Sequence, residues 1–177
     1  MPASGMIRAH CGVGNAAGRT MIRKLHEIVD RHFAHAVESA PDQFACRPGC
    51  SDCCLVDLSV FPVEAALVRQ AFAELPDATR KAAAERASLA RHCCMLDPAD
   101  GRCIVYHARP VICRSHGLTV LIDGNLDHCP KNYGDRPAAR DCILDLEKLN
   151  TALVSVNMAS GGDANRVRMA DIALESK

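Results

Sequence analysis

Aromatic residues and an excess of charge are both missing from this chain of 177 residues. There is no tryptophan, and 4 phenylalanines and 2 tyrosines are too few rings for the stacking platforms that bind single-stranded nucleic acid. The 21 basic residues balance the 21 acidic residues, which argues against a nucleic-acid clamp or a polybasic membrane binder. The composition therefore predicts an aliphatic core and no nucleic-acid partner.

Long apolar runs are also missing. The first 20 residues hold no apolar stretch of the length that a secretory signal needs, and no stretch of about 18 apolar residues occurs anywhere in the chain. Gly12, Gly14 and Gly18 lack the GxGxxG spacing of a nucleotide loop, and no Ser/His/Asp set stands out. We therefore expect a cytoplasmic protein without a membrane segment.

The apolar pattern predicts one mainly helical domain, since 49% of the residues are hydrophobic. Helical periodicity covers residues 19–40, 62–74, 78–92 and 138–159. Residues 56–60 alternate as in a short strand, and residues 118–122 precede the hairpin turn signal Asp123-Gly124. Residues 1–18 are expected to be disordered and residues 161–177 to be a tail. The predicted fold is mainly α with a short β-hairpin, in which the helices of domain 19–160 flank an irregular cysteine-rich metal-binding centre.

Cysteine is the one residue type present in excess, with 11 copies. An odd number cannot pair completely within one chain, and the cytosol reduces disulfides, so metal binding is the favoured explanation. Cys11 and Cys142 lie apart from the two clusters, and Cys93 is an open ninth candidate. The predicted metal ligands form two clusters, within the cysteine-rich core at residues 44–131: Cys46, Cys50, Cys53 and Cys54, then Cys94, Cys103, Cys113 and Cys129.

Soft thiolate ligands select zinc or iron–sulfur clusters. Zinc ribbons usually show paired CxxC arms, and this chain has one such step. Close thiols followed by a distant Cys129-Pro130 are similar to the arrangement in bacterial ferredoxins. We therefore favour an iron–sulfur cluster, with room for a second metal, and keep zinc as the alternative. The CxxxCxxC spacing from Cys46 to Cys53 is shared with radical S-adenosylmethionine enzymes, but the repeated strand–helix units of their barrel are missing here.

Basic residues accompany the cysteines. Arg109 and Arg114 bracket Cys113, and we expect both to donate hydrogen bonds to thiolate sulfur and to offset its charge. Arg47 and Arg102 fit this role and an ordinary surface role equally well.

Histidine and glutamate supply weaker candidates. His116 follows Cys113 by three residues and is an open alternative ligand for a mixed zinc site. His32 and His35 are also three residues apart and could share a metal, but we expect a solvated or edge-of-core pair. Glu64 could act as a base, but we expect a solvated glutamate on its helix.

Residues 94–114, with the motif Gly101-Arg-Cys103 and the sequence Arg109-Pro110-Val-Ile-Cys113-Arg114, resemble the core of the YkgJ-type cysteine-cluster family. The resemblance covers residues 44–131, although the first spacer, Arg47-Pro48-Gly49, is one residue longer than that of the family. It implies a zinc- or iron-chelating centre, and a related domain occurs in flagellin lysine N-methylases. The resulting hypothesis is an iron–sulfur protein for redox chemistry or protein modification, with a protein substrate or redox partner. The alternatives are a zinc-stabilised structural or partner-binding module, and a carrier of labile metal.

Overall fold

The computed structural model describes residues 16–89, 92–134 and 136–175, and within them helices hold far more residues than strands do. The mainly α class is thereby confirmed. The α-helices are α1 (Ala16–Ser39), α2 (Pro62–Ala73), α3 (Asp77–Leu89), α4 (Val111–Ser115), α5 (Leu146–Ala159) and α6 (Met169–Leu174). The strands are β1 (Ser59–Val60), β2 (Leu96–Asp97), β3 (Arg102–Cys103), β4 (Thr119–Ile122), β5 (Asn125–Asp127), β6 (Ile143–Asp145) and β7 (Val167–Arg168). Four short 3-10 turns join them: η1 (Pro41–Gln43), η2 (Asp52–Cys54), η3 (Tyr106–Ala108) and η4 (Arg140–Cys142).

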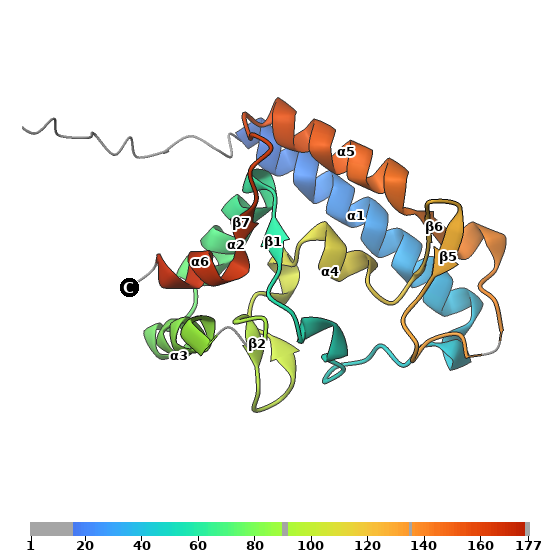
Figure 1. Cartoon of the computed structure of the whole chain (residues 1–177), viewed down its shortest axis with the longest axis horizontal. Helices are drawn as coiled ribbons and strands as arrows, with labels where there is room; N and C mark the ends of the chain where they lie inside the picture. Colours follow the sequence, from blue (N-terminus) through green and yellow to red (C-terminus); the bar gives the residue numbers. More distant parts are fainter. Residues whose placement is uncertain (1–15, 90–91, 135, 176–177) are drawn as a thin grey trace, which may run out of the picture.

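Helices flank the irregular cysteine-rich segments (Figure 1). The long helices α1 and α5 lie side by side at one end of the molecule, and α3 and α6 lie together at the other (Figure 1). The core between α1, α2 and α5 contains the aliphatic side chains of Ile22, Val29, Val63 and Leu153. Within the described part of the chain, no helix combines the length and the apolar character that crossing a bilayer demands.

The predicted hairpin is present, and a third strand that was not predicted pairs with it. Strands β4 and β5 pair antiparallel through Ile122 and Asn125, and positive φ angles at Asp123 (49°) and Gly124 (75°) make the two-residue turn. Strand β6 pairs parallel with β4, so the helix expected from residue 138 begins only at Leu146. The Asp145 carboxylate accepts a hydrogen bond from the Lys148 amide at 3.0 Å and fixes this later start.

The two ends of the chain differ from expectation. Helix α1 begins at Ala16, inside the segment expected to be disordered, while residues 1–15, with Cys11, lie outside the described residues. Residues 161–177 were expected to form a tail, but β7 pairs with β1 and α6 packs on α3. Met169 and Ile172 are at most 2% exposed, because the apolar residues of this polar-looking segment gather on one face.

Candidate metal centre

The first cysteine segment is folded by two consecutive turns. The Cys50 amide donates to the Arg47 carbonyl at 2.9 Å, and Gly49 supplies the positive φ of 92° that this turn requires. Turn η2 follows at once and is closed by the Cys54 amide on the Ser51 carbonyl at 2.8 Å. The Pro48-Gly49 pair therefore makes a loop, as the sequence predicts, and four thiols project from nine residues of folded backbone.

The second segment is hydrogen-bonded directly to the first. The Cys93 amide donates to the Cys54 carbonyl at 2.9 Å, and Leu96 in β2 faces Cys103 in β3. A Cβ added at Gly101 would lie 3.0 Å from the Gly49 carbonyl oxygen, so the turns of the two segments touch. Backbone contacts thus bring Cys54, Cys93 and Cys103 to one place.

Helix α4 carries the next thiol, that of Cys113. Its start is held by Glu64, whose carboxylate accepts the Val111 amide at 2.8 Å and the Phe61 amide at 3.2 Å. Glu64 is 2% exposed, and burial raises the pKa of its carboxyl although both amide bonds lower it. The expectation of a solvated glutamate is wrong: Glu64 joins α2 to the helix that bears Cys113.

Five thiols come together around α4, and we call Cys53, Cys54, Cys93, Cys103 and Cys113 the α4 group. Burial and, to a smaller extent, neighbouring thiolates of the same group raise the pKa of Cys93 to about 11 and that of Cys113 to about 12. The Cys53 thiol donates a hydrogen bond to the Cys54 sulfur, which lowers the pKa of Cys54 and raises that of Cys53. A cation in the group would relieve this mutual repulsion.

A second set of thiols lies around a buried asparagine, and we call Cys46, Cys50 and Cys129 the Asn132 group. The Asn132 side chain is fully buried, accepts the Ala45 amide at 2.8 Å, and donates to the Gly117 carbonyl at 2.7 Å and to the Cys46 sulfur at 3.4 Å. Burial raises the pKa of Cys46, the Asn132 bond lowers it, and Cys50, Cys129 and Cys53 raise it. Cys53 is thus close enough to act on both groups.

Cys94 is placed apart from the α4 group. It is 1% exposed, and its thiol donates to the Met169 carbonyl at 3.4 Å, on the side of the core formed with α6. Its neighbour Cys93 instead lies with the α4 group, where it acts on the pKa values of Cys54 and Cys113. The other seven cysteines expected as ligands all fall within the two groups.

The arginines divide into two roles. Arg109 lowers the pKa of Cys53, Cys103 and Cys113, and its guanidinium lies 3.7 Å from the Tyr106 ring centre. It therefore supplies positive charge to the α4 group, as expected, while its Nε donates to the Tyr106 carbonyl at 3.2 Å and not to sulfur.

Arg114 was expected to serve sulfur as well, and this is wrong. Its guanidinium binds Asp30 at 2.6 Å and the carbonyls of His107 and Arg109 at 2.5 and 2.8 Å. The side chain faces α1 and holds the loop before α4 against that helix. Arg47 and Arg102 are exposed, as is His116, which ends α4.

Residues that sequence analysis missed are the ones that hold the thiols in place. A Cβ at Gly117 would lie 2.7 Å from the Cys46 sulfur and 3.2 Å from the Asn132 amide nitrogen, so only glycine fits there. Gly117 also has a φ of +103°. The proximity of Asn132 to the Cys129-Pro130 step was the only available signal for that residue.

The sulfur atoms of the α4 group are farther apart than the ligand atoms of a single metal ion. Among the described residues, three potential ligand atoms lie within 4.8 Å of one another only at His35, Asp141 and Cys142. A tetrahedral zinc site with Zn–S bonds of about 2.3 Å needs sulfur atoms about 3.8 Å apart. No three sulfur atoms of the α4 group therefore lie as close together as those of a tetrahedral zinc site.

Comparison with known proteins gives one result. The model of the CxxCxxCC family, described as a "putative zinc- or iron-chelating domain", matches residues 45–148, which is more than half of the chain. No curated protein and no solved structure gives a significant match.

Proposed function

Because this chain belongs to the CxxCxxCC family of zinc- or iron-chelating domains, we propose that its α4 group holds an iron–sulfur cluster and that a second metal lies in the Asn132 group. Cys54, Cys93, Cys103 and Cys113 are the proposed cluster ligands. Cys53 joins Cys46, Cys50 and Cys129 to give the second site four thiolates. This set differs from the sequence-based one in a single member, with Cys93 in place of Cys94.

The spacing of the thiols carries the proposal. Four segments of chain bring the α4 group together, yet no three of its sulfur atoms lie within 4.8 Å of one another. In an iron–sulfur cubane each of the four cysteines binds its own iron at a different corner, so the thiolates are separated by the inorganic core. The wider spacing supports a cluster over a lone zinc ion.

Charge and exposure support a redox use. A cluster with four thiolates is negatively charged, and Arg109 lies where it lowers the pKa of three thiols of the group. Cys54, Cys103 and Cys113 are only partly buried. We propose that the cluster exchanges electrons with a protein partner that docks over these cysteines.

Anaerobic purification followed by iron, zinc and acid-labile sulfide analysis tests the proposal. We expect iron and sulfide in equal amounts, broad visible absorption, and reversible bleaching by a reductant. Cys113→Ser should lose the cluster, while the matched change Cys94→Ser at a core thiol should keep it. Zinc without sulfide would replace the redox function with a zinc-stabilised structural or partner-binding module.

A further inference from the structure

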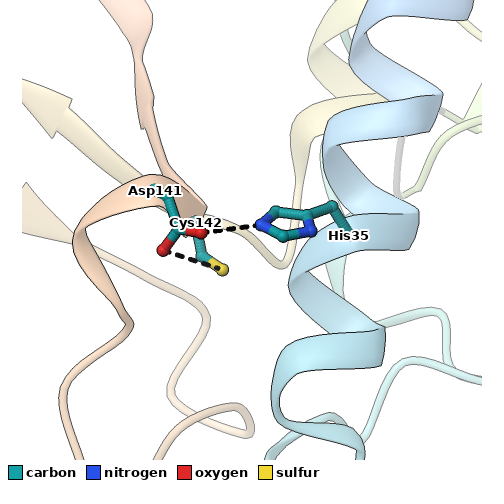
Figure 2. A group of neighbouring side chains, drawn as sticks. All are labelled: His35, Asp141 and Cys142. Carbon is teal, nitrogen blue, oxygen red and sulfur yellow. Dashed lines mark hydrogen bonds and ion pairs between the residues drawn. The ribbon is translucent and has the colours of Figure 1, made fainter.

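A separate set of potential ligands lies between α1 and η4. His35 projects from α1 toward Asp141 and Cys142 in η4, more than 100 residues later in the chain (Figure 2). The His35 ring nitrogen Nε2 lies 2.9 Å from Asp141 Oδ2, and the Cys142 sulfur lies 4.0 Å from Asp141 Oδ1. We propose that these three side chains form a zinc site that is independent of the cysteine centre.

The distances suit coordination without rearrangement of the backbone. With zinc bonds of about 2.3 Å to sulfur and about 2.0–2.2 Å to nitrogen and oxygen, the ligand atoms of a tetrahedral site are roughly 3.4–3.6 Å apart. The His35 nitrogen lies 2.9 Å from Asp141 Oδ2, the Cys142 sulfur lies 4.0 Å from Asp141 Oδ1, and one ligand atom from each residue lies within 4.8 Å of the other two. Side-chain rotations that bring one Asp141 oxygen toward both partners would complete the ligand set.

The donor set selects the class of metal. One imidazole nitrogen, one carboxylate oxygen and one thiolate sulfur form a mixed set of borderline softness, which suits Zn²⁺ and disfavours Mg²⁺ and Ca²⁺. Three protein ligands leave a fourth position open to water or to another ligand.

The supporting structure fixes both sides of the site. Cys142 is 2% exposed and packs with Ala36 and Leu118, while the side chains of His35 and Asp141 are 50% and 69% exposed. The sulfur thus lies beneath two ligands that solvent reaches. His32, one turn earlier on α1, lies 3.2 Å from the Cys142 carbonyl oxygen and holds η4 against the helix.

An ion at this position would bridge α1 and the segment that leads into β6. The ordinary alternative is a surface ion pair between His35 and Asp141, which is weak in water and involves no thiol. Participation of the Cys142 sulfur distinguishes the two explanations.

Cobalt titration of the metal-loaded protein tests the site, with Co²⁺ as a spectroscopic stand-in for Zn²⁺. We expect one further equivalent to bind with tetrahedral visible bands and a sulfur-to-cobalt charge-transfer band. His35→Ala and Asp141→Asn should each weaken this binding by at least about tenfold. Cys142→Ser should abolish the charge-transfer band, and Glu27→Gln, which removes an exposed carboxylate elsewhere on α1, should change nothing.

The result separates this site from the cysteine centre. Cys113→Ser should disturb the α4 group and leave the additional cobalt site intact. The proposal fails if wild type binds no further equivalent, or if that equivalent survives His35→Ala and Asp141→Asn unchanged. The two surface variants keep the test valid even if Cys142→Ser does not fold.

Discussion

A single methyl group added at Gly117 should disturb the Asn132 group, because it would displace the Cys46 sulfur. In Gly117→Ala the new Cβ would lie 2.7 Å from the Cys46 sulfur, about 1 Å inside ordinary contact. The Asn132 amide at 3.2 Å blocks movement on a second side. Alanine must also adopt a φ of +103°.

The expected cost has two parts. Backbone strain at such a φ is about 1–3 kcal/mol, and overpacking of a filled space is about 1–3 kcal/mol. Gly124→Ala measures backbone strain without overpacking, because Gly124 has a φ of +75° and nothing within 4 Å of an added Cβ. At roughly 2–4 °C per kcal/mol for a chain of this size, the overpacking part alone should lower the thermal midpoint by about 2–12 °C beyond that of Gly124→Ala.

Metal analysis complements the thermal scan. Because Cys46 is displaced, Gly117→Ala should lose the metal of the Asn132 group, whereas Gly124→Ala should keep it. The reasoning would be refuted if Gly117→Ala bound as much metal as wild type and unfolded at the same temperature as Gly124→Ala.

Three further predictions concern the α4 group and its surroundings. Cys93→Ser should remove metal from the α4 group, and Cys94→Ser should keep the metal while lowering the thermal midpoint; equal metal loss in both would contradict the assignment. Arg109→Gln should lower the reduction potential, because the reduced cluster loses a nearby positive charge, whereas Arg114→Gln should keep the potential and cost roughly 2–4 kcal/mol in urea unfolding. His26 is 5% exposed, and burial, followed by the charge of Arg114, lowers its pKa to about 4. The imidazole of the unfolded chain titrates near pH 6.5. The free energy of unfolding therefore carries no penalty from His26 above that pH, and it falls by about 3 kcal/mol as the pH is lowered toward 4. Unfolding of wild type and His26→Leu at several pH values should show this extra loss only in wild type.

Helix α2 and the β4–β5 hairpin were predictable from the local sequence pattern. Pro62 and the apolar spacing behind it predicted α2 closely, and Asp123-Gly124 predicted the turn between β4 and β5 because both residues tolerate positive φ. Local pattern failed where a distant segment decides the conformation. The sequence of residues 143–145 by itself predicts helix. These residues instead form β6, because Thr119 in β4 offers a parallel partner.

The candidate site was predictable in its chemistry and not in its detailed arrangement. Spacing alone located the cysteine-rich segments, but Cys93 and Cys94 are adjacent and only the fold of residues 93–96 decides which thiol faces the α4 group. Arg114 follows Cys113 directly, yet the helical turn of α4 directs its guanidinium toward Asp30. The hydrogen bonds that join Asn132 to Ala45 and Glu64 to Val111 connect residues 87 and 47 positions apart, a relation that no sequence window contains.

The pairing of β7 with β1 has a consequence for the order of events during synthesis. The Met169 amide donates to the Leu58 carbonyl at 2.8 Å, and the Met169 carbonyl accepts the Cys94 thiol. The backbone on either side of Cys53 and Cys93 therefore lacks its final support until residues 167–174 have left the ribosome. Since domains fold as units once their chain is available, we expect the thiols of the α4 group to reach their final arrangement only after residues 167–174 have been synthesised.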